Sequence, residues 1–231
     1  MRALSNYLKG FAFLKRTGLS LNHQGYINFK RWNSVGSDTK QNNWKIRIQL
    51  AAAYRGLEAY NMNEGVCNHL TALAPASSDN GEVMLVIPYG LHWSEVTPSC
   101  LIGLNSNNEV IEGKGTPETS AACIHRGIYR SCPNIRSILH THAPYATALG
   151  CLETPTLRMV HQNSARFLNR EAYDTDYSGL VHDVEEGIRL GNVLGNKDAL
   201  FMGNHGVITV ADNIASAFDN MYYLERAAMV Q

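Results

Sequence analysis

The pair His140 and His142 is the feature of this sequence best suited to chemistry. The apolar segment 135–139 comes just before the pair and predicts a buried strand that ends there. Side chains alternate between the two faces of a strand, so two histidines separated by one residue point the same way. Pro144 has no backbone donor and discourages further strand pairing, which places the pair at a strand end. Two imidazoles on one side of a strand can bind one metal ion.

A third histidine, His205, follows another apolar segment, residues 199–202, which also predicts a strand. It lies between Gly203 and Gly206, and these glycines should allow an unusual backbone at this turn. Three histidines with one open coordination position are typical of a catalytic metal site rather than a closed structural one. A single histidine would be better explained as a surface or hydrogen-bonded core residue. The combination of three leaves both interpretations open.

The elements that must position these histidines follow from hydrophobic periodicity and turn residues. We expect helices at residues 43–60, 119–132, 143–152, 184–194 and 213–229. We expect strands at residues 66–72, 82–87, 101–104, 109–112, 135–139, 156–161, 199–202 and 207–210, and a polar loop at 174–177. Asn43 should cap the first helix, and Val184 and Ile188 should face inward from the fourth.

Three segments together resemble the class II aldolase/adducin family. They are the run His140–Leu149, the turn Asn204–Val207 and the C-terminal segment Met221–Ala227. The motifs occur in the family's order and spacing. The similarity extends from about Asn43 to the C-terminus, roughly four fifths of the chain.

The resemblance implies a fold, a cofactor and an assembly. The fold would be α/β: a single three-layer α/β/α domain with a mostly antiparallel central sheet, over residues 41–231. The cofactor would be a divalent metal ion, Zn²⁺ in the first place and Fe²⁺ as the alternative, held by His140, His142 and His205. Relatives assemble as tetramers with their sites near subunit interfaces, which implies a homo-oligomer here as well.

The chain departs from the catalytic members of the family at the start of the helix predicted from residue 119. Those aldolases read S-S-E there, and their Glu, four residues before the helix His (here His125), is the general acid/base. This chain reads Thr119-Ser120-Ala121. Both hydroxyls remain available for substrate or for capping the helix, but alanine cannot transfer protons. Glu118 is the nearest acid and could substitute if the helix start were reshaped.

Other candidate substrate and catalytic residues also come from the resemblance. The stretch that begins at Asn68 matches a segment that contributes to the phosphate pocket of sugar-phosphate aldolases, although ordinary strand hydrogen bonding explains Asn68 equally well. Tyr89 stands in a Pro-x-Gly turn where aldolases that bind phosphorylated sugars tend to carry Thr, which argues against a phosphorylated ligand. His161 lies near the position of a catalytic Tyr. It could replace that Tyr as a proton donor, or be a residue at the rim of the site.

The composition fits one soluble globular domain. The chain has 231 residues, of which 45% are hydrophobic and 17% charged, and its net charge of zero gives no indication of nucleic-acid binding. No apolar run approaches the ~20 residues that span a bilayer. Five cysteines, odd in number and without a C-x-x-C pair, favour a reducing compartment over a disulfide framework.

The net charge of zero conceals an asymmetry at the N-terminus. Residues 1–40 contain seven Lys or Arg and a single acid, Asp38, which leaves a net charge of −6 for the rest of the chain. An acid-poor segment of this kind resembles a mitochondrial transit peptide, and the alternative is an extension that is atypical of the family. We therefore expect a cytoplasmic or mitochondrial protein whose folded domain begins near residue 41.

Three functions remain in competition at this stage. The first is a metal-dependent lyase of the class II aldolase type, which acts on a small hydroxy-carbonyl compound through an enediolate stabilised by the three-histidine site. The second is a non-haem iron oxygenase or decarboxylase, because three imidazoles also suit Fe²⁺. The third is an adducin-head-like module without catalysis, used for oligomerisation and contacts with the actin cytoskeleton. The absence of the acid at Ala121 favours the third, whereas the presence of all three histidines favours an enzyme.

Overall fold

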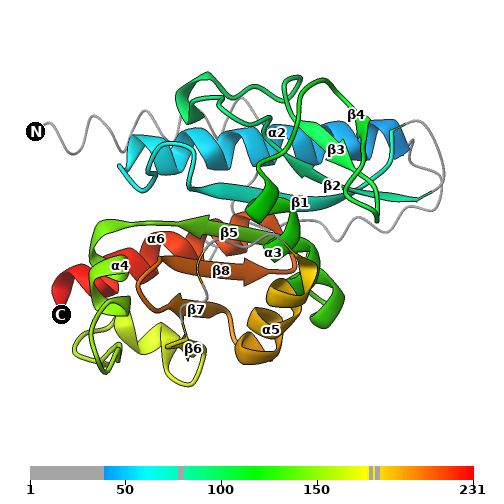
Figure 1. Ribbon diagram of the computed structural model, residues 1–231. Helices are drawn as coiled ribbons and strands as arrows, with labels where there is room; N and C mark the ends of the chain where they lie inside the picture. Colours follow the sequence, from blue (N-terminus) through cyan, green and yellow to red (C-terminus); the bar gives the residue numbers. More distant parts are fainter. Residues whose placement is uncertain (1–38, 78–80, 177–178, 180–182) are drawn as a thin grey trace, which may run out of the picture. The chain divides into compact units, whose positions relative to one another are not determined.

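An eight-stranded sheet forms the centre of the domain (Figure 1). The computed structural model describes residues 39–77, 81–176, 179 and 183–231, so the segment that resembles a transit peptide lies almost entirely outside the described residues. The strands are β1 (His69–Pro75), β2 (Glu82–Val86), β3 (Ile102–Leu104), β4 (Val110–Glu112), β5 (Ser137–Thr141), β6 (Glu171–Asp174), β7 (Ala199–Met202) and β8 (Val207–Ala211). Their order is β4-β3-β2-β1-β5-β8-β7-β6. All neighbours pair antiparallel except β6 and β7, which confirms the expected mostly antiparallel sheet.

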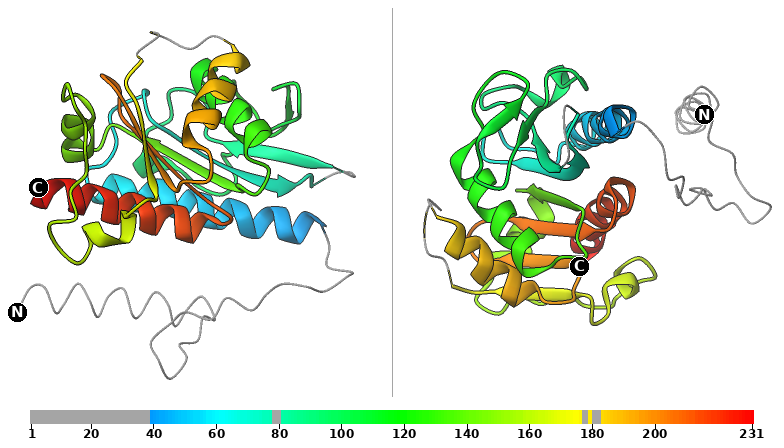
Figure 2. Two further views of the ribbon diagram at one scale, coloured as in Figure 1. Left: turned by 90° about the horizontal axis from the view of Figure 1, so that it is seen from below. Right: turned by 90° about the vertical axis from the view of Figure 1, so that its right-hand side faces the viewer.

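Helices cover both faces of this sheet. They are α2 (Thr39–Ala59), α3 (Thr119–Ser131), α4 (Pro144–Gly150), α5 (Val184–Leu194) and α6 (Ile214–Val230). Figure 2 shows α2 and α6 side by side on one face, and α3 and α5 on the other. Two short 3-10 turns, η1 (Trp93–Glu95) and η2 (Ser164–Phe167), complete the elements of the described chain. No helix among the described residues is both long and apolar enough to cross a membrane.

Alternation along the strands divides the buried residues into two cores. On β5, Leu139 packs into the core under α2 and α6, whereas Ile138 packs into the core under α3 and α5. His140 follows the same alternation as Ile138 and therefore points toward the α3 side of the sheet. Thr141 points to the other side, where its hydroxyl donates to the sulfur of Met221 on α6. The register of the sheet thus decides on which face the histidine pair lies.

A close helix crossing between α3 and α5 depends on glycine. A Cβ at Gly127 would lie 2.3 Å from the backbone carbon of Gly187, and a Cβ at Gly187 would lie 2.6 Å from two carbonyl oxygens of α3. Only residues without a side chain allow the two backbones to approach this closely. Val184 and Ile188, which were expected to face inward, are only partly buried, although Val184 does pack against the core under α3 and α5. The buried positions of α5 are Gly187, Leu190, Gly191 and Leu194.

The first helix begins four residues earlier than expected, and Asn43 does not cap it. Asn43 lies inside α2 with 2% of its surface exposed, and its amide donates to the Pro75 carbonyl and to Glu112 Oε2, at 2.8 and 3.1 Å. Arg47, one turn on, makes a buried ion pair with the same Glu112 oxygen at 2.7 Å. Asn43 therefore ties α2 to the outer strand β4, a long-range contact that its helical position conceals.

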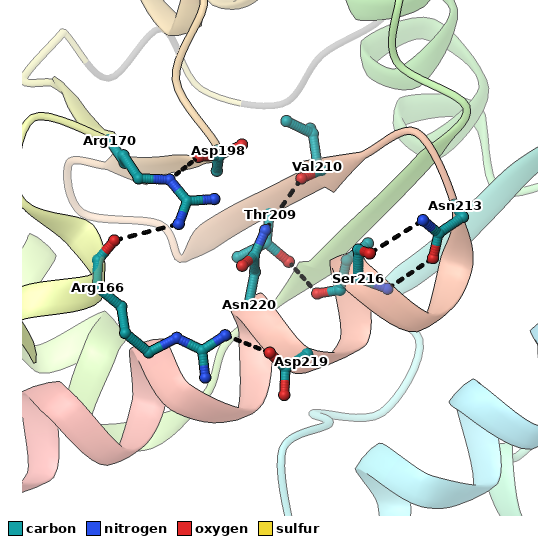
Figure 3. Close-up of polar contacts among 10 residues, drawn as sticks. Arg166, Arg170, Asp198, Thr209, Val210, Asn213, Ser216, Asp219 and Asn220 are labelled. Atoms are coloured by element: carbon teal, nitrogen blue, oxygen red, sulfur yellow. Dashed lines mark hydrogen bonds and ion pairs between the residues drawn. The ribbon is translucent and has the colours of Figure 1, made fainter. Parts of the chain in front are cut away.

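The N-terminal half of the C-terminal helix is attached to the sheet by polar contacts (Figure 3). Asn213 caps α6, since its Oδ1 accepts the backbone N–H of Ser216 at 2.8 Å. Farther on, Thr209 of β8 donates to the Ala217 carbonyl at 3.0 Å, and Asn220 donates to the Val210 carbonyl at 3.3 Å. These contacts keep α6 in register with β8, the strand that follows the turn at His205.

The expected strand at residues 156–161 is wrong. This segment pairs with no strand of the described sheet, and several of its backbone groups bond to side chains instead. The Leu157 N–H donates to the Tyr173 hydroxyl at 2.8 Å, and the Arg158 N–H donates to the side chain of Gln231 at 2.7 Å. A run rich in apolar residues therefore forms an extended connection beside the sheet.

Conversely, β6 occupies a segment whose end was expected to be a polar loop. It pairs parallel with β7 at the edge of the sheet, and its last residue, Asp174, is buried. The Asp174 carboxylate is satisfied by two bonds from Arg189 on α5, at 2.9 and 2.6 Å. A buried acid with a distant partner looks like a loop residue in the sequence, which explains the error.

Candidate metal centre

The structure brings His140, His142 and His205 together. One ring nitrogen of each lies within 4.8 Å of the corresponding nitrogens of the other two. The ring centroids of His140 and His205 are 4.7 Å apart, and the ring centroid of His142 lies 5.1 Å from each of them. His140 is fully buried, whereas the other two are partly exposed. Two strand ends, those of β5 and β7, thus deliver three histidines to one point on the α3 side of the sheet.

Hydrogen bonds fix which nitrogen of His140 and of His142 faces the cluster. His140 Nδ1 donates to the Val207 carbonyl at 3.1 Å, and His142 Nδ1 lies 2.7 Å from Glu64 Oε2. Each ring therefore keeps its proton on Nδ1, which leaves Nε2 with a free lone pair. Both Nε2 atoms are buried and have no hydrogen-bond partner within the described part of the chain. A buried, unpartnered acceptor is costly unless a ligand occupies it.

The turn that carries His205 owes its shape to a different residue from the one expected. Neither Gly203 nor Gly206 has a positive φ; Asn204 does, at 54°. Gly206 is required for space instead, because a Cβ there would lie 2.6 Å from both His142 Cδ2 and the Thr141 carbonyl oxygen. The glycine after His205 thus allows the turn to pack directly against the end of β5.

His140 and His205 are held neutral by their surroundings. Burial lowers the pKa of His140 well below its usual range, and the neighbouring histidines lower it further. Burial and the nearby His142 lower the pKa of His205 to about 4. Neutral imidazoles are the form that binds metal ions.

A buried polar chain extends from the cluster to α3, and two of its members, His69 and Tyr129, had no predicted role. The ring of His69 lies 4.7 Å from that of His140, its opposite residue in the β1–β5 pairing. His69 Nδ1 contacts His125 Nε2 at 3.0 Å, and His125 Nδ1 contacts the Thr71 hydroxyl at 2.7 Å. The Thr71 hydroxyl also contacts the Tyr129 hydroxyl at 2.9 Å. Periodicity could have indicated this polar chain, because His69 and Thr71 share one strand face and His125 and Tyr129 share one helix face.

A small hollow of about 20 Å³ opens next to His69. It is lined by the segment before and at the start of β1, by the turn Pro88–Leu91 and by the start of α3. Asn68 lies in its wall: its Oδ1 accepts the backbone N–H groups of Glu64 and His142, at 2.5 and 3.3 Å. Its Nδ2 is buried and has no partner among the described residues. The hollow has room for about one water-sized group, and Asn68 has a donor available for it.

The family model described as "Class II Aldolase and Adducin N-terminal domain" matches residues 48–231. The chain belongs to the class II aldolase and adducin family. The expected family and fold class are thereby confirmed.

The family includes both adducin-related proteins and aldolases. The chain is 34% identical over 193 residues to an adducin-related protein of Schizosaccharomyces pombe, covering 80% of this chain and 57% of that protein. It is 29% identical over 190 residues to alpha-adducin of Rattus norvegicus, covering 80% of this chain and 25% of the adducin. Among solved structures, L-fuculose 1-phosphate aldolase from Glaciozyma antarctica PI12 aligns with a TM-score of 0.74 and 28% identity, covering 86% of this chain and 76% of that chain. The chain thus spans about half of the yeast relative and a quarter of the adducin.

The family's acid/base position faces the hollow. Ala121 lines it, and so does Glu118. Glu118 is the N-cap of α3: its carboxylate accepts the N–H groups of Ser120 and Ala121, at 3.0 and 2.6 Å, and the Ser120 hydroxyl at 2.5 Å. Ser120 is thus engaged by Glu118, and Thr119 is exposed; neither lines the hollow.

His161 lies outside the histidine cluster. It follows the extended connection 156–160, and its backbone N–H donates to the Ser164 hydroxyl at 3.1 Å. Both of its ring nitrogens are buried and have no partner among the described residues. It is not one of the residues that line the hollow.

A buried acid supports the backbone just beyond the histidine pair. Glu225 of α6 accepts the N–H groups of Tyr145 and Ala146, at 3.1 and 2.8 Å. These are the first donors of α4, whose own N-cap residue, Ala143, provides no side-chain bond. Glu225 belongs to the C-terminal segment that resembles the family. Here this segment stabilises the start of α4, next to the candidate metal centre.

Proposed function

We propose that this chain is a metal-dependent enzyme of the class II aldolase type that acts on a small hydroxy-carbonyl compound. His140, His142 and His205 would hold the metal ion. The observation that carries the proposal is the pair of buried Nε2 atoms on His140 and His142, which have no hydrogen-bond partner among the described residues, in a cluster that brings one ring nitrogen of each of the three histidines within 4.8 Å of the others. Neutral nitrogen ligands in this number suit Zn²⁺, and they also accommodate Fe²⁺.

The residues around the cluster suit a small polar substrate. A bound divalent ion supplies Lewis acidity to a substrate oxygen. The hollow beside His69 would accept one oxygen of the molecule, and the unpartnered Nδ2 of Asn68 would donate to that oxygen. Tyr89 is bulky and 59% exposed at the rim of the hollow, which disfavours the binding of a phosphate group there.

Proton transfer is assigned to Glu118. Its carboxylate lines the same hollow as Ala121, the position at which catalytic relatives carry their acid. A general base is identified first by its position next to the substrate. Glu118 is the acidic residue among those that line the hollow. His161 is the second candidate, because its two buried ring nitrogens are unpartnered within the described chain.

The experiment uses protein stripped with a chelator and reloaded with Zn²⁺ or Fe²⁺. We expect the zinc form to cleave short, unphosphorylated hydroxy-aldehydes or hydroxy-ketones, and the Glu118→Gln variant to lose most of the rate. His92→Ala, which alters an exposed histidine outside the cluster, should retain full activity. Activity only in the iron form, with oxygen consumption, would support an oxygenase instead.

The second candidate function is an adducin-like assembly module. Ala121 favours it, because the acid/base of the catalytic relatives is absent there. In that case the protein should be a stable homo-oligomer that contacts the actin cytoskeleton and shows no turnover with either metal. Co-sedimentation with actin filaments, measured beside the activity assay, separates this function from the enzyme.

A further inference from the structure

We propose that His69 is a fixed hydrogen-bond donor to a ligand oxygen in the hollow, and that Tyr129, Thr71 and His125 hold it in the donating tautomer. The tautomer is a property of this chain alone. The role toward a ligand rests on the proposed function, because it assumes a hydroxy-carbonyl compound at the metal centre.

The direction of the hydrogen-bond chain follows from its far end. The Tyr129 hydroxyl contacts the Thr71 hydroxyl and no other partner among the described residues. Burial raises the pKa of the Tyr129 phenol, which therefore keeps its proton and donates it to Thr71 Oγ1. Thr71 is fully buried and must direct its own proton to its other neighbour, His125 Nδ1, at 2.7 Å.

The same reasoning passes through His125 to His69. With Nδ1 accepting from Thr71, the proton of the neutral His125 ring lies on Nε2, which donates to His69 Nδ1 at 3.0 Å. His69 then carries its own proton on Nε2. Both rings are buried, which favours the neutral form of each. Three residues, Thr71 on the strand and His125 and Tyr129 on the helix, thus specify one tautomer of the His69 ring.

The Nε2–H of His69 is available to a ligand. It makes no hydrogen bond within the described part of the chain, and His69 lines the hollow. Next to it, Asn68 Nδ2 is a second donor without a partner in the described structure. Two donors beside the metal centre recognise an acceptor, namely a carbonyl or hydroxyl oxygen that gains negative charge as a hydroxy-carbonyl compound reacts. A neutral imidazole of this kind polarises an oxygen without removing a proton from it.

The tautomer is measured in metal-free protein by nitrogen NMR of labelled histidine, with His69 assigned by its loss in His69→Gln. We expect a protonated Nε2 and an unprotonated Nδ1 in the wild type, and a mixture of tautomers in Tyr129→Phe. Thr71→Val, which removes the hydroxyl at nearly constant shape, should release the ring as well; if this variant does not fold, Tyr129→Phe decides. A His69 ring protonated on Nδ1 in the wild type would overturn the inference.

The ligand role is measured with acetohydroxamate, a small molecule with two adjacent oxygens, on the zinc-loaded protein. We expect His69→Ala to weaken its binding about ten- to a hundredfold, the range for a hydrogen bond to a charged group. His69→Gln, whose amide can donate from a similar place, should recover part of the loss. Zinc affinity is measured for each variant separately. Equal acetohydroxamate affinity in wild type and His69→Ala would refute the role, whereas a protein that binds no zinc refutes the metal centre and leaves the NMR result to decide the tautomer.

Discussion

Replacement of Glu225 by alanine should destabilise the protein by about 3 kcal/mol. Glu225 is 6% exposed and accepts two backbone N–H groups at the start of α4. A hydrogen bond to a charged group contributes about 1.5–3 kcal/mol. The bond from Ala146 should count fully, because Ala146 is buried and its N–H would have no replacement partner. The bond from Tyr145 should count less, since the half-exposed Tyr145 leaves room for water.

Urea denaturation of the metal-free protein, followed by circular dichroism, measures this change. Glu225→Gln keeps one acceptor oxygen for the buried N–H, so we expect it to lose only about 1 kcal/mol. Glu153→Ala, on an exposed loop, is the control and should leave the midpoint unchanged. The hydrogen-bond explanation is refuted if Glu225→Ala unfolds at the wild-type urea concentration. It is also refuted if the glutamine variant loses as much as the alanine variant, because charge alone would then account for the effect.

Three further predictions concern packing, the metal ligands and pH. Gly127→Ala should prevent the close approach of α5 and lower the thermal midpoint strongly, whereas Gly150→Ala, whose Cβ meets its nearest atom at 3.5 Å, should be tolerated. Glu64→Gln should weaken zinc binding, measured by competition with a chelator, by about tenfold; this is the lower end of the range for such partners, because Glu64 is exposed and its bond to His142 competes with water. The metal-free protein should lose stability as the pH falls from about 6.5 toward 4. In this window the unfolded state protonates His205 while the folded state keeps it neutral. A His205→Gln variant with an unchanged slope of unfolding free energy against pH would contradict this reasoning.

The histidine pair and most of the elements could be predicted from the sequence because their signals are local. Alternation along a strand places His140 and His142 on one side, and the proline that follows indicates the strand end. The helix over residues 184–194 is found with the expected bounds, since Asp183 caps it and Gly195 ends it. These features depend on neighbours within a few residues.

The rest of the site depends on contacts between distant segments. Glu225 lies 79 residues from the N–H group of Ala146 that it accepts. Likewise, Thr71 and Tyr129 meet only because β1 packs under α3. Periodicity shows that each of these residues faces inward, but it does not show which residue it meets. The same limit explains why the segment from Glu171 was missed as a strand, because its partner β7 begins 28 residues later.

Metal content is the most direct test of the central claim. The wild-type protein, purified without chelator, should contain about one equivalent of zinc or iron by elemental analysis. The double variant His140→Ala/His205→Ala should contain none and should still fold, as judged by circular dichroism. His92→Ala, as the control, should keep the wild-type content. Absence of metal from the wild type, or an unchanged content in a folded double variant, would contradict the three-histidine metal centre.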